Sequence, residues 1–393
     1  MKKVFLFSLF LVLGLVLSQC LPVWLGEAFL TAEKVAKTLM FVCLAFIMIN
    51  VGREFELDKT KWRSYAADYF IAMATAAVPW IMVAFYYMFL LPADLFGNWD
   101  AWKENLLLSR FAAPTSAGIL FTMLAAAGLR REWIYKKTQV LAIFDDLDTI
   151  LLMIPLQIFM IGFKWQLFAV VIVITFLLVI GWKKLGTIRL SQTWKSILFY
   201  AVCIVAVTES IYLLIKWMMG ADGAIHIEVL LPAFVLGMVM KTVHQHGNRD
   251  EKITGMISYL FMFLVGLSTP QFIGIDHGHR ITEAVGIIAA QPMPSWEVLV
   301  VHVIVVTLLS NLGKMFPLFF YRDRQLEERL ALSVGMFTRG EVGAGIIVIA
   351  MGYNLGGPAL IISVLSLVLN LLLTGGFVVI VKRLAQQAYG LKE

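Results

Sequence analysis

Three carboxylates lie within four positions of the segment "AIFDDLDTI", residues 142–150. They belong to Asp145, Asp146 and Asp148, and long apolar runs flank the segment on both sides. An ionised acid at bilayer depth costs several kcal/mol, so acids there are usually paired or functional. Neighbouring carboxylates in a partly dehydrated cavity resist losing both protons and titrate as a coupled unit. Hard cations prefer oxygen ligands, so the segment predicts that a cation and protons compete for the same oxygens.

Three basic residues, Arg110, Lys314 and Arg339, also lie inside apolar runs. Lys314 lies about 10 Å from the cytoplasmic end of its run, and Asp145 and Asp146 lie about 10–12 Å from theirs, at 1.5 Å per residue. Burial without pairing would be prohibitive, so equal depth predicts an ion pair between Lys314 and this acid pair. Arg110 is expected to be a snorkelling or cavity-lining charge near the outer face.

Two of the apolar runs are interrupted near their middle. In the run 105–128, Pro114 removes a backbone donor and breaks the helix. Thr115 and Ser116 follow it, and their hydroxyls can satisfy freed backbone groups or bind an ion. Small residues in membrane helices also serve ordinary helix packing, so this interruption alone does not define a site.

The second interruption, "TRGEVGAG", lies in the run 328–352, where three glycines weaken the helix beside Arg339 and Glu341. We expect these two charges to pair with each other or with the core acids. The two interrupted runs have opposite orientations. Such a pair is typical of an inverted-repeat transporter with a site at the bilayer midplane.

The composition requires a membrane protein. The chain has 393 residues, 60% of them hydrophobic and 15% charged, against about 25% charged in soluble domains. The net charge of +6 lies in short loops, which argues against a nucleic-acid partner. The three cysteines have no CxxC spacing, so neither a disulfide framework nor a metal centre is predicted.

Apolar runs long enough to cross about 30 Å of hydrocarbon predict an all-α integral membrane protein with about 12 transmembrane helices, arranged as an inverted repeat with two broken, crossing helices. The runs lie near residues 4–22, 36–52, 68–91, 105–128, 138–162, 164–182, 194–217, 224–241, 252–272, 298–320, 328–352 and 358–381.

The distribution of Lys and Arg predicts the orientation. With a cytoplasmic N-terminus, the inside segments hold 23 of these residues and the outside loops hold 6. The positive-inside rule then places both termini in the cytoplasm. The first 20 residues also resemble a signal peptide that ends at a lipoprotein-type cysteine. Gln19 is too large for the position before such a cysteine, so we expect a retained first helix.

These motifs together resemble the cation/proton antiporter superfamily, in its electrogenic sodium/proton branch. "AIFDDLDTI" resembles the paired-aspartate motif, and "SNLGKMFPLFF" resembles the helix that carries the family's lysine. "FTRGEVGAGIIVIA" is similar to the broken span that follows it, and "AFIMINVGREFELD" is similar to the end of the second span. The resemblance covers nearly the whole chain.

The resemblance implies a division of labour between two domains. A core of about 68–162 and 298–382 would carry the ion, while about 1–52 and 194–272 would form a scaffold that mediates dimerisation. Residues of about 164–182 would form a linking helix. The protein is then expected to be a homodimer in the cell (inner) membrane, and an elevator-like movement of the core would alternate access.

The resemblance also assigns roles to particular residues. Asp146 would be the principal sodium ligand, Asp145 would pair with Lys314, and Thr115 and Ser116 would lie where the broken helices cross. The substrates would be protons and sodium, lithium or another monovalent cation, with no cofactor.

Asp148 is an acid that this pattern does not explain. On a helix it lies within 60° of the face of Asp145. Two roles remain open from the sequence: a third titrating group, or a countercharge for Arg339.

Several other functions are compatible with parts of the pattern. The same scaffold could exchange potassium or an organic anion, although the acid pair argues against an anion. "DDLD" is similar to the magnesium–diphosphate motif of membrane prenyltransferases, but no other run supplies the second acidic cluster which that chemistry needs. The GxGD setting of an intramembrane aspartyl protease is absent. A channel fits broken helices and a buried ion pair less well than alternating access does.

Overall fold

The computed structural model of the chain has helical residues in every predicted apolar run; of the run 164–182, only residues 172, 175–177 and 179–181 are described, and these are helical. The structure describes residues 2–54, 62–126, 128–161, 172, 175–177, 179–181, 183–184, 186–219, 229–240, 248–268, 286–288, 290–340, 342–343, 346–347, 350, 353 and 355–390.

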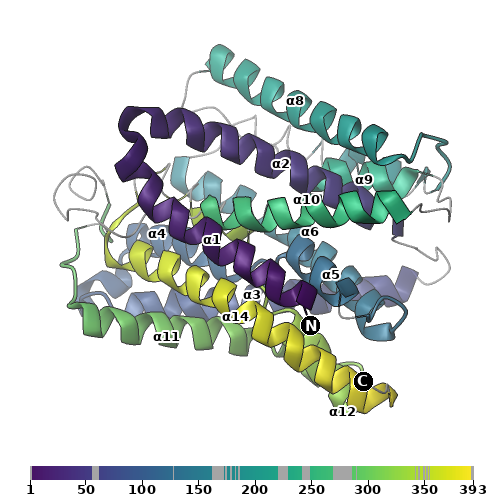
Figure 1. The fold of residues 1–393 in the computed structure, drawn as a ribbon. Coiled ribbons are helices and arrows are strands. Elements are labelled where there is room, and N and C mark those ends of the chain that lie inside the picture. Colours follow the sequence, from purple (N-terminus) through teal and green to yellow (C-terminus); the bar gives the residue numbers. More distant parts are fainter. Residues whose placement is uncertain are drawn as a thin grey trace. The chain divides into compact units, whose positions relative to one another are not determined.

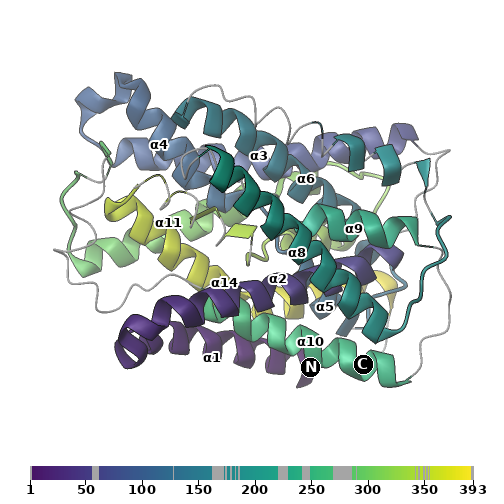
Figure 2. The same cartoon turned by 90° about the horizontal axis from the view of Figure 1, so that it is seen from above.

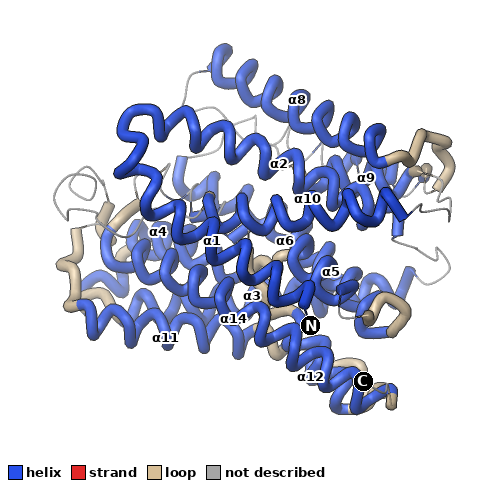
Figure 3. Tube along the Cα trace, in the orientation of Figure 1, coloured by secondary structure: helices blue, strands red, loops and turns tan. Residues whose placement is uncertain are grey.

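The described residues are helical almost throughout, as Figures 1 and 3 show. Within them there is no strand, and a single isolated bridge joins Ile188 to Met240. By length and composition, the helices in this part of the chain that could cross a membrane lie at Arg63–Phe89, Trp194–Leu214, Trp296–Phe319 and Gly357–Tyr389. The predicted all-α membrane fold is confirmed.

The chain divides into two compact units. Unit 1 contains residues 1–24, 61–156 and 265–393, and unit 2 contains residues 25–60 and 157–264. All the predicted site residues that the structure describes belong to unit 1.

Unit 2 is built around the packing of α2 (Phe29–Glu54) against α9 (Leu230–Val239) and α8 (Trp194–Met219). Two glycines allow α2 and α9 to approach closely. A Cβ atom on Gly52 would collide with the backbone carbonyl of Phe234, and one on Gly237 would collide with that of Ile49. Small residues at such contacts are a usual feature of helix pairs in membranes. α10 (Asn248–Leu267) lies almost entirely in this unit.

Unit 1 contains α3, α14 and most of α6, the three longest helices among the described residues, and both interrupted ones. α3 packs against α4 and α11, while α14 packs against α11 and α12; Figures 1 and 2 both show α11 and α14 side by side. The elements are α1 (Lys2–Leu25), α3 (Trp62–Phe89), α4 (Trp99–Ser109), η4 (Arg110–Ala112), α5 (Ala117–Ala126), α6 (Trp133–Ile161), α11 (Trp296–Gly313), η6 (Phe316–Phe319), α12 (Leu326–Gly335) and α14 (Gly357–Tyr389).

A polar cluster ties together the N-terminal ends of α3 and α6 and the chain after η6. The Lys137 ammonium lies 2.8 Å from Asp68 Oδ2, and the Tyr321 hydroxyl donates to Asp68 Oδ1 at 2.7 Å. Tyr321 has a φ of 51°, a left-handed conformation that is uncommon outside glycine. Burial and the neighbouring Asp68 raise the pKa of Tyr321, so its phenol remains a hydrogen-bond donor at neutral pH. The cluster fixes the position of Tyr321, which ends the short segment that follows Lys314.

Candidate functional site

The two interrupted helices meet at their interruptions. α4 and η4 end at Ala112, α5 begins at Ala117, and the residues between form neither helix nor strand. α12 ends at Gly335, and the next described helical residue is Val342. The backbone N–H of Ser116 donates to the carbonyl of Thr338 at 2.9 Å.

Further contacts at this crossing satisfy backbone groups that the broken helices leave free. The hydroxyl of Thr115 donates to the carbonyl of Met336 at 3.1 Å. A Cβ atom on Gly340 would lie 2.7 Å from Ser116 Oγ, so only glycine fits at this crossing without a shift. Thr115 and Ser116 therefore lie at the crossing of the two broken helices, and both are buried.

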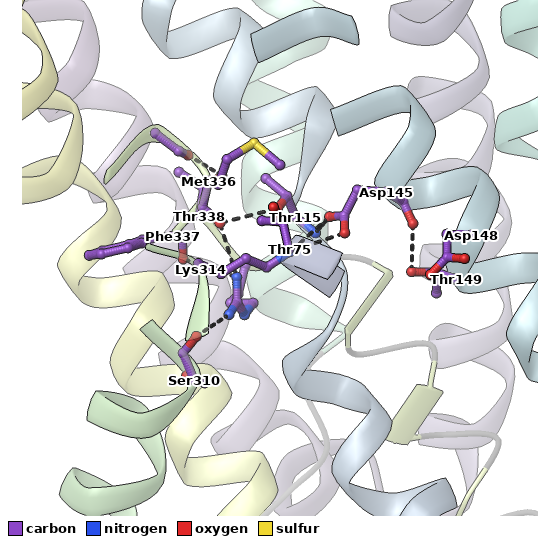
Figure 4. A network of polar contacts seen from close by, with 12 residues as sticks. Thr75, Thr115, Asp145, Asp148, Thr149, Ser310, Lys314, Met336, Phe337 and Thr338 are labelled. Carbon is purple, nitrogen blue, oxygen red and sulfur yellow. Dashed lines mark hydrogen bonds and ion pairs between the residues drawn. The ribbon is translucent and has the colours of Figure 1, made fainter. Parts of the chain in front are cut away.

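Lys314 and Asp145 form a fully buried ion pair beside this crossing. The Lys314 ammonium lies 2.9 Å from Oδ2 and 3.1 Å from Oδ1 of Asp145, and it also donates to the Thr115 hydroxyl at 3.0 Å. The backbone N–H of Thr115 donates to Asp145 Oδ2 at 2.7 Å. Figure 4 shows the three side chains directed toward one another. This carboxylate thus gains a countercharge and a backbone donor at the start of a half-helix, where the helix dipole favours negative charge.

The local fold explains how Lys314 reaches the site. α11 ends at Gly313, so Lys314 is the C-terminal cap of the helix and not an interior residue of one continuous span over 298–320. A cation at a helix C-terminus is favoured by the dipole. The chain then turns through η6, which separates Lys314 from the anchored Tyr321.

Asp146 follows Asp145 on α6, and its side chain is 1% exposed. Adjacent helical residues point about 100° apart, so Asp146 presents its carboxylate to a different direction from the Lys314 pair. The hydroxyls of Thr115 and Ser116 lie at the helix crossing beside the neighbouring Asp145, where Thr115 contacts both Asp145 and Lys314. In the described part of the chain no group of three His, Cys, Asp or Glu side chains could hold a metal ion. A cation ligand shell built from the described residues would therefore draw on hydroxyl, carbonyl or water oxygens as well as carboxylate.

Asp148 pairs with Arg110, and not with Arg339 as one interpretation of the sequence suggested. Arg110 Nη2 lies 3.7 Å from Asp148 Oδ2 and donates to the Asp148 carbonyl at 3.2 Å. The guanidinium also lies over the Trp80 ring, 4.5 Å from its centroid. Arg110 is 0% exposed and paired with Asp148, so it is not a snorkelling charge, while the alternative of a cavity-lining charge stays a prediction.

This second ion pair leads to a stability prediction. Asp148→Asn should lower the free energy of unfolding by up to about 3–5 kcal/mol, because it leaves the buried Arg110 charge unpaired. The double variant Arg110→Met/Asp148→Leu removes both charges and should melt closer to the unsubstituted protein. Thermal unfolding in detergent measures the stability of both variants. An Asp148→Asn protein that melts at the unsubstituted temperature would contradict the pairing.

Arg339 lies at the second interruption and caps free carbonyls. Its guanidinium donates to Met336 O at 3.2 Å and to Ser310 O at 3.3 Å, and the residue is 0% exposed. Among the described residues no ion pair of Arg339 occurs within 4.0 Å. Glu341, its expected partner, lies outside the described residues. Arg339 thus links the interruption after α12 to Ser310 of α11, which lies one turn before Lys314.

Sequence reasoning missed several polar groups that surround the site. The carbonyls of Met336 and Ser310 act as acceptors there, and no side-chain pattern marks a carbonyl in advance. Apart from Asn370, a polar residue that the sequence marks in the run 358–381, the buried hydroxyls and amides of α11 and α14 were also missed. Their recurrence at intervals of three or four residues was a usable signal, because that spacing places them on one helix face.

Comparison with known proteins places the chain in a family. The model of the family described as "sodium/hydrogen exchanger, transmembrane" matches residues 2–385. The solved structure of the sodium proton antiporter MjNhaP1 from Methanocaldococcus jannaschii at pH 8 is similar in fold, with a TM-score of 0.58, 14% sequence identity, and coverage of 98% of this chain and 92% of that one. A search of curated proteins gave no match. Because the family model spans nearly the whole chain, this protein belongs to the transmembrane sodium/hydrogen exchanger family, and it is a multi-pass membrane antiporter of cations and protons, not an enzyme.

Proposed function

We propose that the protein exchanges protons for sodium or lithium by alternating access, and that the exchange is electrogenic. The observation that carries this proposal is the buried Lys314–Asp145 ion pair, which lies beside Asp146 at the crossing of two broken helices. A site with two adjacent acids and one base can bind a cation and more than one proton in turn.

The proposed exchange follows from competition at the Asp146 carboxylate. A dehydrated cation binds when Asp146 is ionised and takes additional oxygens from Thr115, Ser116, backbone carbonyls and water. A proton on Asp146 removes the negative charge and releases the cation. If the empty site crosses the membrane reluctantly, because an uncompensated charge in lipid is costly, this competition becomes obligatory exchange.

The ion pair supplies the second proton in this proposal. When Lys314 separates from Asp145, the freed carboxylate can take up a proton, and the pair re-forms when the proton leaves. Two protons would then move for each monovalent cation, so net charge would cross the membrane. Driving forces would therefore include the membrane potential, worth about 2.3 kcal/mol per charge per 100 mV.

We also propose a location for the protein in the cell and a role for each of its two units. We place the protein in the cell (inner) membrane with both termini in the cytoplasm, because the Lys and Arg bias of 23 to 6 follows the positive-inside rule. Unit 1 would act as the ion-carrying core and unit 2 as the scaffold for a homodimer. Two segments of unit 1, 61–156 and 265–393, enclose Asp145, Asp146 and Lys314 and so support the assignment of the core, although residues 1–24, expected in the scaffold, also belong to unit 1.

Proton flux in proteoliposomes tests this function. When a sodium or lithium gradient is imposed, the purified protein should move protons against the direction of cation flow and so change the pH of the lumen. A potassium gradient should have a weaker effect. A clamped membrane potential should change the rate and the reversal point, because the exchange moves net charge. Flux driven equally well by potassium would shift the assignment to a potassium/proton antiporter, and flux insensitive to potential would refute electrogenic exchange.

A further inference from the structure

A row of buried polar side chains runs between α11 and α14, two helices otherwise rich in Leu, Ile and Val. Each set recurs at intervals of about three or four residues and so occupies one face of its helix. All members are buried. We call this row the α11–α14 seam: Thr307, Ser310 and Asn311 on α11, and Ser363, Ser366 and Asn370 on α14.

The inner end of the seam reaches the ion pair. Thr307 Oγ1 and Ser366 Oγ lie 2.9 Å apart and join the two helices by a hydrogen bond. The Ser310 carbonyl accepts from Arg339 Nη2 at 3.3 Å. Lys314 follows Ser310 by one turn, so the polar row leads directly to the Lys314–Asp145 pair.

The other end of the seam opens into a cavity of about 420 Å³. This cavity lies where α11 and α14 begin and α3 ends, which the proposed orientation places on the outer side. Tyr87 belongs to both features, since it lines the cavity and its hydroxyl lies 2.7 Å from Ser363 Oγ. Other polar lining residues are Asn105, Gln291 and His302.

Three buried amide oxygens along this route need a partner. The Oδ1 atoms of Asn105, Asn311 and Asn370 have no hydrogen-bond partner within the described residues. Asn105 and Asn370 are 0% exposed and Asn311 is 8% exposed. Buried polar atoms are nearly always satisfied, and ordered water serves where protein groups do not. These oxygens therefore point to water along the cavity and the seam.

Helix packing alone explains only part of the row. Hydroxyls in membrane helices commonly bond the carbonyl one turn earlier or join neighbouring helices, and Ser363 does bond the Ala359 carbonyl. That account requires no water, but it leaves the three amide oxygens buried without a hydrogen-bond partner among the described residues, which is costly.

We propose that the α11–α14 seam is a hydrated path that carries protons between the cavity and the Lys314–Asp145 pair. The proposal rests on the proposed exchange function and assigns its protons a route separate from that of the cation. Direct hydroxyl pairs 2.7–2.9 Å apart leave no space for a cation with its ligands. A hydroxyl or water both donates and accepts, so each group can pass one proton on as it receives another and is left unchanged.

The double variant Thr307→Val/Ser366→Ala tests this path, because it removes the hydroxyl pair while nearly preserving side-chain volume. Two transport modes are measured in the same proteoliposomes. Sodium–proton exchange should fall by about tenfold, which corresponds to about 1.4 kcal/mol added to the barrier. Equilibrium exchange of labelled sodium for unlabelled sodium moves no net proton, so its rate should remain unchanged. Thr307→Ser keeps the hydroxyl and should retain sodium–proton exchange.

Thr374→Val provides a matched control. Thr374 is buried on the same helix and bonds the carbonyl one turn earlier, but it lies beyond Asn370 on the side away from the cavity. It should leave both modes unchanged. The proposal is overturned if the double variant slows both modes together or slows neither. If the double variant does not fold, Thr307→Val and Ser366→Ala are measured separately against the same two criteria. Absence of cation-driven proton flux in the unsubstituted protein would instead refute the proposed function.

Discussion

Replacing Asp146 with asparagine should abolish cation-driven proton flux while leaving the protein folded. The amide keeps the size of the carboxyl group but carries no charge and binds no proton, so neither partner in the exchange can be held there. Asp146 does not form the Lys314 ion pair, since that base contacts Asp145. The fold should therefore survive the change. Flux driven by a sodium gradient in proteoliposomes measures the effect, and unfolding in detergent checks the fold.

The control for this substitution is Asp323→Asn, the same chemical change at a side chain that is 74% exposed. Its flux should match that of the unsubstituted protein. Near-normal flux in Asp146→Asn would refute the assignment of Asp146 as the principal ligand. Asp145 and Asp148, the other acids of α6, would then be the candidate ligands.

Replacing Lys314 with methionine should cause the largest loss of stability. Methionine keeps most of the aliphatic stem, so the change reports the charge. Removing one partner from a buried pair typically costs about 3–5 kcal/mol. The Asp145 carboxylate would keep its bond from the Thr115 backbone but lose its only countercharge within 4.0 Å among the described residues. A proton on the freed acid would reduce the loss, which should then be larger at high pH than at low pH.

A second substitution tests whether the loss arises from this pair. Asp145→Asn in the Lys314→Met background removes the orphaned carboxylate and should restore part of the melting temperature. Additive losses in the double variant would show that the two residues do not stabilise each other. The pH dependence supplies an independent criterion, because a change in packing alone would lower stability equally at every pH.

Local patterns were sufficient to predict the broken helices. Pro114 cannot continue a helix, and the glycines near Gly340 weaken one, so both breaks follow from neighbouring residues. Depth within the bilayer was sufficient to match Lys314 with the pair Asp145 and Asp146, because the positions are counted from the same membrane face. The choice of Asp145 as the partner came from the family resemblance.

The partner of Asp148 was not predictable in this way. The sequence suggested that the span begins near residue 105, which puts Arg110 close to the outer face. α4 begins at Trp99, so Arg110 lies about 16 Å along the helix and reaches the depth of Asp148. A polar start such as "NWDAWKEN" hides the true beginning of a helix from a count of apolar residues. The same limit applies to the Asp68–Lys137–Tyr321 cluster, whose members are brought together only by the tertiary fold.

The distance along the chain between Lys314 and its carboxylate has a consequence for biogenesis. The two residues are separated by 169 positions, and a ribosome adds about 5–20 residues per second. The first half of unit 1 therefore exists for about 10–30 s before its lysine is synthesised. Arg110, the partner of Asp148, precedes it by 38 positions and is therefore already synthesised during that interval. If α6 enters lipid before Lys314 is made, Asp145 lacks its countercharge, and we expect that acid to be protonated until the second half of unit 1 packs against it.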